Sequence, residues 1–424
     1  MIKFLLKGII RDRSRSLFPV ITVVLGVSLT VLGYSYFNGV MTSWMQTSAK
    51  FEAGHMKIMS RAYAENADQT PNDLAFIGVE NLLADFKKDF PELLVAPRIR
   101  FGGLFDIPDE LGETKAQGPI IGLAVDLFSE ESPEKDMLNL ENAVVRGRMP
   151  QKYGEILISD EFARRLNVLP GQTSTLIGST MYGNMAVVNF TVVGTLRFGV
   201  LAMDRGTIIA DLADIQEALD MKDAAGEILV FFNDFVYREE AADRITETFN
   251  EKYSDKDDEF SPVMVTFYDQ GGMADFMGMV STFQGVLIFS FIAVMSIVLW
   301  NAGLMGTLRR YGEIGVRLAV GEAKGHLYRS MILESLMIGV IGTILGTVLG
   351  LGFAYFLQSK GINLGNMMQS SNMVINEIIR AKVTPVSYVI GFVPGLLATL
   401  LGTSISGLGI YKRQTSQLMK ELEV

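Results

Sequence analysis

The sequence predicts a membrane protein: an α-helical four-span bundle with a large α+β extracytoplasmic domain of two subdomains between the first and second spans. Three observations lead to this fold class. Of the 424 residues, 49% are hydrophobic, a high share for a wholly soluble chain. Four long stretches contain no Asp, Glu, Lys or Arg. The one long segment that remains alternates polar and apolar residues, as a water-soluble domain does.

Each uncharged stretch exceeds the roughly 20 apolar residues with which a helix crosses the hydrocarbon core of a bilayer. The predicted spans are residues 17–41, 279–304, 335–357 and 385–410. Basic residues precede the first span, as they precede a cleaved signal sequence. The apolar core of this span is longer than the roughly 7–15 residues of a signal peptide, which favours an uncleaved signal anchor.

The distribution of charge predicts the orientation of the chain. Segments 1–16, 305–334 and 411–424 carry 13 Lys and Arg against 6 Asp and Glu, whereas 42–275 carries 21 against 40. Lys and Arg in short flanking loops set the orientation of membrane helices. We therefore expect the three short segments, and both termini, in the cytoplasm, and we expect 42–275 and the loop 358–384 outside it.

Residue usage excludes several kinds of site. The chain has no cysteine, which excludes a disulfide framework and a thiolate metal site. Its two histidines, His55 and His326, lie far apart and on opposite predicted sides, so a histidine metal cluster is excluded as well. The acidic run DKDDEF (255–260) lacks the ligand spacing and glycine of an EF-hand and is interpreted as a solvated loop. We expect no metal, no cofactor and no nucleic-acid partner for this chain.

Strands and helices alternate in the predicted external domain 42–275. The expected elements are strand 54–60, helix 78–91, strand 93–107, strand 155–159, helix 160–167, strand 173–178, strand 185–194, strand 207–210, helix 212–221, strand 227–232, helix 236–253 and strand 263–268. Ser159 is the expected N-cap of the helix that follows it. The pair Gly102 and Gly103 is expected to interrupt its strand. A β-rich middle flanked by alternating elements predicts two subdomains.

Glycines recur in the last two spans. Gly342, Gly346 and Gly350 stand four residues apart in the third span, and Gly391 and Gly395 do so in the fourth. Small residues at this spacing let another helix approach closely, so we predict a helix-packing interface and leave open whether the partner helix belongs to another subunit. The alternative is that membrane helices simply tolerate glycine. The spans are nearly free of ionisable residues, which argues against a proton-coupled or ion-coupled transporter.

The cytoplasmic stretch RRYGEIGVRLAVGEAKGHLYRS (309–330) is the main candidate for a functional segment. A phosphate-binding P-loop needs Lys and then Ser or Thr after its second glycine, whereas Gly321 is followed by Glu322. The chain also shows no Ser/His/Asp arrangement with supporting motifs. We therefore expect no catalytic residue in this chain.

A docking helix fits this stretch better. Glu313 and Arg317 stand at i and i+4 in the favourable order, Ile314 and Leu318 share a face, and Gly321 is placed to end the helix. Such a helix would transmit force between a cytoplasmic partner and the spans. An ordinary basic loop is the alternative that spacing alone leaves open.

Resemblance to a known family favours the docking helix. RRYGEIGVRLAVGEAKGHLYRSMILESL resembles the intracellular segment of the MacB/FtsX/LolC-like ABC transporter permeases, and VVRGRMPQKYGEILISDEFARRLNVLPGQ followed by FTVVGTLRFG is similar to their periplasmic core domain. On this match Glu334 takes the place of the glutamate that opens the third span. The ATPase-coupling positions are taken by Glu313, Ile314, Gly315, Arg317, Ala319 and Gly321.

The resemblance implies an inner-membrane permease that works as a dimer, with a second copy or a paralogue. It also implies a separate cytoplasmic ABC ATPase subunit that binds ATP and Mg, with the spans passing its closure to the external domains. GHMKIMS favours the lipoprotein-releasing LolC/LolE branch, so membrane lipid, a lipoprotein or other amphiphilic cargo and a periplasmic carrier or adaptor are implied partners. Only STMYGNMAVV stands where LolC carries its carrier-capturing hairpin, which leaves a LolE-like role or export of another amphiphile open. The second hypothesis is a non-transporting FtsX-like regulator of an external hydrolase or sensor.

Overall fold

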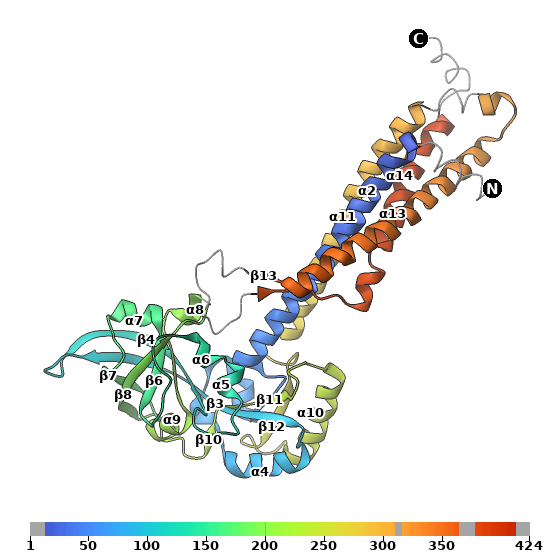
Figure 1. Cartoon of the computed structure of the whole chain (residues 1–424). Helices are drawn as coiled ribbons and strands as arrows, with labels where there is room; N and C mark the ends of the chain where they lie inside the picture. Colours follow the sequence, from blue (N-terminus) through green and yellow to red (C-terminus); the bar gives the residue numbers. More distant parts are fainter. Residues whose placement is uncertain (1–12, 200, 310–315, 364–377, 413–424) are drawn as a thin grey trace. The chain divides into compact units, whose positions relative to one another are not determined.

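The computed structural model describes residues 13–199, 201–309, 316–363 and 378–412 (Figure 1). The chain divides into two compact units. The sheet unit is built mainly from Trp44–Phe276, and the helical unit is built from the chain before and after it.

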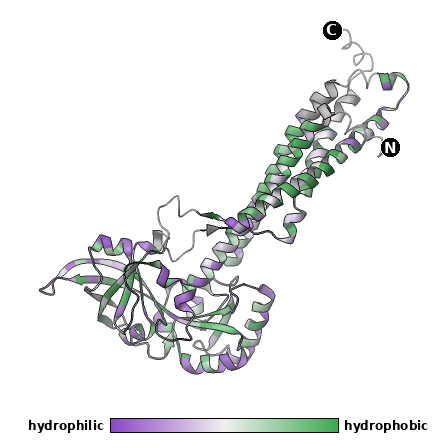
Figure 2. Ribbon diagram, viewed as in Figure 1, coloured by the Kyte–Doolittle hydropathy of each residue, from purple (hydrophilic) through white to green (hydrophobic). Residues whose placement is uncertain are grey.

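Four long helices form the helical unit. They are α2 (Arg13–Ser48), α11 (Met273–Arg309), α13 (Lys324–Lys360) and α14 (Phe392–Lys412), and the end of α2 and the start of α11 belong to the sheet unit. Among the described residues, four helices are long and apolar enough to cross a membrane. Hydrophobic residues predominate along these helices in Figure 2. The predicted four-span architecture is therefore confirmed.

The helices do not begin and end where the predicted spans do. Helices α2 and α11 extend past 17–41 and 279–304 at both ends, and α13 and α14 begin at other residues than 335 and 385. Helix α13 begins at Lys324 rather than at 335, because the polar residues before the apolar stretch continue the same helix. Glu334 therefore lies inside α13, directly before the predicted span 335–357. The fourth candidate membrane span begins at Pro385, as predicted, whereas the regular helix α14 begins at Phe392. The preceding residues form a separate 3-10 turn, η5 (Pro385–Tyr388), which is fixed by reciprocal side-chain bonds between Thr384 and Ser387.

A ten-stranded sheet forms the centre of the sheet unit. Its order is β12-β1-β11-β3-β4-β9-β6-β8-β5, and β7 pairs with both β3 and β8. The β4–β9 and β6–β8 pairs are parallel, and the other pairs are antiparallel. The strands are β1 (Met56–Ser60), β3 (Leu93–Pro108), β4 (Thr114–Val125), β5 (Val144–Gly147), β6 (Glu155–Ser159), β7 (Thr173–Ser179), β8 (Met185–Leu196), β9 (Thr207–Asp211), β11 (Glu227–Phe232) and β12 (Pro262–Thr266).

Short helices and turns complete the described chain. The α-helices are α3 (Arg61–Glu65), α4 (Val79–Asp89), α5 (Glu134–Met137), α6 (Leu140–Ala143), α7 (Asp160–Leu166), α8 (Leu201–Asp204), α9 (Leu212–Ala218) and α10 (Glu239–Tyr253). The other elements are the π-helical turn η1 (Ala49–Ala53), the 3-10 turns η2 (Ala67–Gln69) and η3 (Asn72–Leu74), and the small pairs β2 (Phe76–Ile77) with β10 (Ala224–Ala225) and β13 (Ile362–Asn363) with β14 (Ile378–Ile379).

The sheet has two halves, each with its own buried core. In the first half, α4 and α10 cover β1, β11 and β12, and the rings of Phe86 and Phe249 lie 6.0 Å apart between the two helices. In the second half, Phe105 of β3 packs against Phe162 of α7, with the two ring centroids 6.0 Å apart. The long strand β3 runs through both halves (Figure 1). The α+β prediction is confirmed, and the two subdomains are the two halves of one continuous sheet.

The glycine pair does not interrupt β3. Gly102 and Gly103 keep the register of the ladder, opposite Ile121 and Ile120 of β4. A Cβ atom on Gly103 would lie 2.6 Å from the carbonyl oxygen of Ile177 in β7. The glycine therefore permits a close approach between strands rather than a break, so the predicted interruption is wrong.

The expected N-cap at Ser159 is confirmed. The Ser159 hydroxyl accepts a hydrogen bond from the Phe162 amide at 3.3 Å, and α7 ends at Asn167, whose φ is +55°. The turn between β7 and β8 is short, and the Thr180 amide closes it by donating to the Asn184 carbonyl at 2.8 Å.

Candidate functional site

The connector between α11 and α13 contains the predicted docking segment. Glu313, Ile314 and Gly315 lie outside the described residues. The described part begins with one helical turn, 316–319, which carries Arg317 and Ala319.

This turn ends at Gly321, as the sequence predicted. Gly321 has a φ of +98°. Its amide donates to the Leu318 carbonyl at 3.1 Å, and the Glu322 amide donates to the Arg317 carbonyl at 3.0 Å. These two bonds form a Schellman motif, in which a left-handed glycine closes a helix. Gly321 is thus required by the backbone conformation, whatever binds the turn.

The turn has one anchored apolar side chain and two open ones. Leu318 packs against the buried Leu327 of α13, which Met331 of the same helix also contacts. Val316 is 54% exposed and Val320 is 85% exposed. Sequence reasoning missed these two valines, although two apolar residues four apart on a helical turn share one face. Together they form an exposed apolar ridge, which we call the valine ridge.

The five predicted packing glycines lie at close helix contacts within the chain. A Cβ atom on Gly342, Gly346 or Gly350 of α13 would lie 2.8 Å from a Cβ atom of α2. A Cβ atom on Gly391 or Gly395 would lie within 3.0 Å of Val27 of α2. The glycines of α13 and those at the start of α14, with Gly391 directly before that helix, therefore face the first helix, and we call this contact the glycine seam. It is an intramolecular contact, whereas the sequence left a subunit interface open.

Hydroxyl groups accompany the glycine seam. Ser35 of α2 donates to Ser387 of η5 at 3.1 Å, and both side chains are fully buried. Thr343 and Thr347 of α13 are buried beside Gly395 and Gly391, and their hydroxyls have no hydrogen-bond partner within the described structure.

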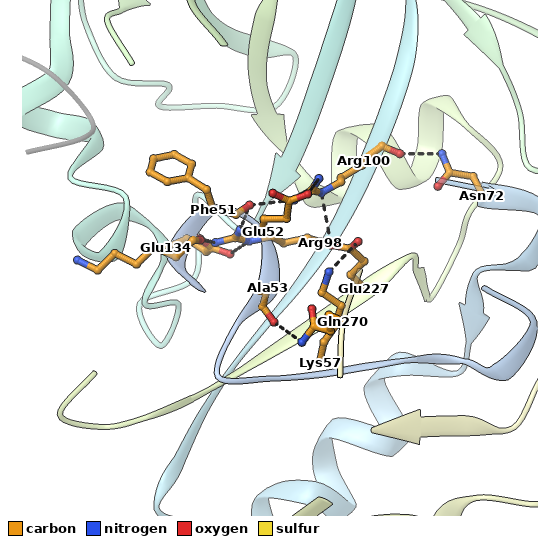
Figure 3. A network of polar contacts seen from close by, with 11 residues as sticks. Phe51, Glu52, Ala53, Lys57, Asn72, Arg98, Arg100, Glu134, Glu227 and Gln270 are labelled. Carbon is orange, nitrogen blue, oxygen red and sulfur yellow. Dashed lines mark hydrogen bonds and ion pairs between the residues drawn. The ribbon is translucent and has the colours of Figure 1, made fainter. Parts of the chain in front are cut away.

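The sheet unit holds a buried ionic network where the first helix ends (Figure 3). Its centre is Arg98 of β3, which is fully buried. The Arg98 guanidinium binds Glu134 through two bonds, Nε to Oε1 at 2.6 Å and Nη2 to Oε2 at 2.8 Å. It also donates to the backbone carbonyls of Lys50 at 2.7 Å and Phe51 at 3.0 Å, both in the turn η1. One side chain thus joins η1, β3 and α5.

A looser set of contacts lies beside this centre. Arg100 donates to the Phe51 carbonyl at 3.1 Å and lies 3.5 Å from Glu52 and 3.4 Å from Glu227. Glu227 also pairs with Lys57 at 3.1 Å. Burial lowers the pKa of Lys57, and the Glu227 carboxylate offsets part of this shift. We call Lys57, Arg98, Arg100, Glu134 and Glu227 together the ionic joint. It was not predicted, because its members are distant in sequence.

His55 follows Gly54, the residue that ends η1. It is 3% exposed, and its Nδ1 accepts a hydrogen bond from the Phe232 amide at 3.2 Å. The rings of Phe231, Phe232 and Tyr237 lie within 5.8 Å of the imidazole. Burial lowers the pKa of His55 to about 4, while the charges of nearby Asp234 and Arg238 act in opposite directions. His55 is therefore a neutral core residue near pH 7. In the described part of the chain, no group of three His, Cys, Asp or Glu residues could hold a metal ion.

Two protein-family models match the chain. The MacB-like periplasmic core domain matches residues 16–248, which is more than half of the chain, and the FtsX-like permease C-terminal domain matches residues 285–415.

Curated relatives match over shorter stretches. The macrolide export ATP-binding/permease protein MacB of Bordetella avium (strain 197N) is 28% identical over 120 residues, which cover 27% of this chain and 18% of the relative. The probable export ATP-binding/permease protein MacB of Pseudomonas entomophila (strain L48) is 30% identical over 120 residues, with the same shares of each chain. The matched stretch thus spans less than a fifth of the length of these relatives. The crystal structure of the periplasmic region of MacB from Actinobacillus actinomycetemcomitans aligns at 12% identity and a TM-score of 0.36, over 52% of this chain and 92% of that chain.

Proposed function

Since the chain belongs to the family of permeases with a MacB-like periplasmic core domain and an FtsX-like C-terminal domain, we propose that it is the transmembrane subunit of an ABC transporter in the inner membrane. One observation carries this proposal: the two family matches follow one another along the chain and between them include the first helix, most of the sheet unit and the last three helices. The subunit itself is non-catalytic, and ATP and Mg bind to a separate ATPase chain.

In this proposal the connector is the surface that contacts the ATPase. The valine ridge supports it, because Val316 and Val320 leave apolar area open to water while Leu318 anchors the turn to α13. Partner proteins commonly bury exposed apolar residues of this kind at the centre of an interface. The connector and both termini then lie in the cytoplasm, and the sheet unit lies in the periplasm, as the charge distribution favours.

A charge on the valine ridge tests the contact. We expect Val320→Asp to reduce co-purification of the ATPase and vanadate-sensitive ATP hydrolysis in the complex by at least tenfold, because a carboxylate at an apolar contact is costly to desolvate. Leu111→Asp is the matched control, since Leu111 is 87% exposed in the sheet unit and Val320 is 85% exposed. Equal hydrolysis in both variants, together with unchanged hydrolysis after reversal of the Glu313 and Arg317 charges, would refute the coupling assignment.

The proposed cargo is a lipoprotein or another amphiphile that is taken from the membrane surface. The permease works as a dimer with a second copy or a paralogue. The closed turn Thr180–Asn184 between β7 and β8 is too short to form a long hook, which favours release without carrier capture at this hairpin. ATP-dependent release of a purified lipoprotein from liposomes that contain the complex tests this role. Absence of release, combined with recovery of a cell-wall hydrolase on the sheet unit, would favour a regulator instead.

A further inference from the structure

We propose that Arg98 is a positioning residue that fixes the end of the first helix to the sheet, and that Arg100 is an adjustable second contact at the same place. Within the ionic joint, the Arg98 contacts would hold η1 rigidly to β3, and the Arg100 contacts could rearrange. We call the Arg98 contacts the pin, because they make η1 and the sheet move as one body.

The backbone of η1 explains why a side chain is needed there. The last carbonyls of a helix have no partner within the helix. Gly54, with a φ of +65°, ends η1, and the next amide, that of His55, donates to Val230 of β11 instead of turning back. The carbonyls of Lys50 and Phe51 are therefore left for another donor. The Arg98 guanidinium donates a hydrogen bond to each of these two carbonyls.

Arg98 itself has little freedom to move. Its planar guanidinium donates bonds from Nε, Nη1 and Nη2, and all four bonds to Glu134, Lys50 and Phe51 are between 2.6 and 3.0 Å long. Both Arg98 and Glu134 are at most 1% exposed, so water offers no substitute for these bonds. A bidentate carboxylate contact that also caps two carbonyls fixes a guanidinium in one orientation.

Arg100 shares the Phe51 carbonyl with Arg98, at 3.1 Å, but it differs in its burial and in its carboxylate contacts. Its side chain is 22% exposed, and its contacts to Glu52 of η1 and Glu227 of β11 are 3.5 and 3.4 Å long. Its Nε and the Oε2 of Glu227 have no hydrogen bond within the described structure. Arg100 is therefore shared between the turn and the sheet, and a small rotation of η1 would exchange one carboxylate for the other.

The consequence for transport rests on the proposed function. Helix α2 is continuous from Arg13 to Ser48, and η1 follows it directly. A displacement of this helix that follows ATP binding by the partner would reach η1, and Arg98 would pass it to β3. Because β3 belongs to both halves of the sheet, one pin can move the whole unit.

Distance measurements by electron paramagnetic resonance test the pin. The chain has no native cysteine, so nitroxides attach only at Gln46→Cys on α2 and Glu247→Cys on α10, two exposed positions of the sheet unit. In the full chain in nanodiscs we expect one narrow distance distribution. With the ATPase assembled, this distance should not change between the nucleotide-free and vanadate-trapped states.

The decisive variant replaces the buried pair without leaving an unpaired charge. Arg98→Met with Glu134→Met keeps apolar volume, which a buried ion pair often tolerates, but it leaves the Lys50 carbonyl without its donor and the Phe51 carbonyl with only the Arg100 bond. We expect its distance distribution to broaden at least twofold. Arg148→Met with Glu155→Met is the control; Glu155 is buried as Glu134 is, while the Arg148 side chain is 45% exposed. That pair is also bidentate, at 2.6 and 2.7 Å, and makes no contact with η1, so its distribution should stay narrow.

Two single variants sharpen the assignment. Arg98→Lys keeps the charge but not the planar fork, so we expect intermediate broadening. Arg100→Gln should leave the distribution narrow. A narrow distribution in the double Arg98 and Glu134 variant would overturn the pin, and broadening in Arg100→Gln equal to that of the double variant would overturn the division of roles. The measurement needs only this chain, so failure to assemble with an ATPase would overturn the proposed function and leave the test of Arg98 decisive.

Discussion

Among the described residues, eight charged side chains are buried in the sheet unit, whereas every buried polar side chain in the helical unit is Ser or Thr. The eight are Lys57, Arg98, Asp106, Glu134, Glu155, Asp160, Asp211 and Glu227. The helical unit instead brings backbones together at the glycine seam. Both units must fix long segments against one another, and they do so by different means.

The difference follows from the solvent that each unit faces. A buried ion pair needs several hydrogen bonds to offset its desolvation, and a folded domain can supply them from backbone and side chains. A helix in lipid has few such partners, so close packing and single hydroxyl bonds replace ions. Four predictions, from the largest expected effect to the smallest, test this contrast.

Removal of one ionic partner in the sheet unit should have the largest effect. Glu134→Ala leaves the Arg98 cation buried without its carboxylate, and we expect a loss of about 3–5 kcal/mol in the free energy of unfolding. Glu131→Ala is the control, because Glu131 also forms a short ion pair, at 2.7 Å with Lys87, but is 80% exposed and should change little. Denaturant unfolding of both variants decides. Equal stability would show that burial does not set the strength of these pairs.

Acid should weaken the sheet unit through His55. Its pKa is about 4 in the folded chain and 6.5 in the unfolded chain, so between these values only the unfolded chain binds the proton. Stability is full above pH 6.5 and falls by about 3 kcal/mol as the pH drops to 4. His55→Asn, which keeps an acceptor for the Phe232 amide, should flatten this slope of the free energy of unfolding against pH. His326→Asn, at the exposed histidine of the helical unit, should leave it unchanged; a slope retained in His55→Asn would assign the acid sensitivity elsewhere.

A methyl group in the glycine seam should have a smaller but local effect. Gly346→Ala would place a Cβ atom 2.8 Å from both the Val24 carbonyl oxygen and the Val27 Cβ, and we expect a cost of about 1–3 kcal/mol. Gly352→Ala on the same helix is the control, since no atom lies within 4 Å of its Cβ position. Thermal unfolding in detergent compares them. If Gly352→Ala is equally destabilising, helix flexibility rather than close contact explains the glycines.

Single hydroxyls should matter least, and less in the helical unit. Ser159→Ala removes the N-cap of α7, at a cost of about 1 kcal/mol. Ser35→Ala removes the bond to Ser387, and such bonds in membrane helices contribute about 0.6 kcal/mol. Matched unfolding of the two variants, with Ser387→Ala for a double-mutant cycle, tests this order. A cost at Ser35 well above that at Ser159 would reverse it.

Local patterns predicted much of the fold. The alternation in 54–60 and the helical spacing in 78–91 became β1 and α4. All five residues of β1 are buried, so its alternation did not mark a buried face, but both patterns are local to a single element. The uncharged stretches identified the four long helices for the same reason. Helix ends were less predictable, since Lys324 and Phe392 are set by polar extension and by the cap at Thr384 rather than by hydrophobicity.

The ionic joint could not be predicted from such patterns. Arg98 lies in a strand whose alternation places it on one face, but its partners come from η1, 47 and 48 residues earlier, and from Glu134, 36 residues later. In the connector, Gly321 was predictable because a left-handed helix end favours glycine, whereas the valine ridge depends on Leu318 packing against α13. The partner that the ridge contacts remains a proposal.

The position of β1 also determines the order in which the chain can fold. This first strand pairs with β11 on one side and with β12 on the other, so both of its neighbours are made last. At about 5–20 residues per second, the roughly 200 residues between β1 and β12 take on the order of ten seconds or more to synthesise. During that time β1, with Met56 and Ile58, has two unpaired edges. Unpaired strand edges are sites at which chains can associate wrongly. Such long-range pairing makes folding slow, so the ten-stranded sheet can be completed only after β12, the element that directly precedes the second long helix, is made.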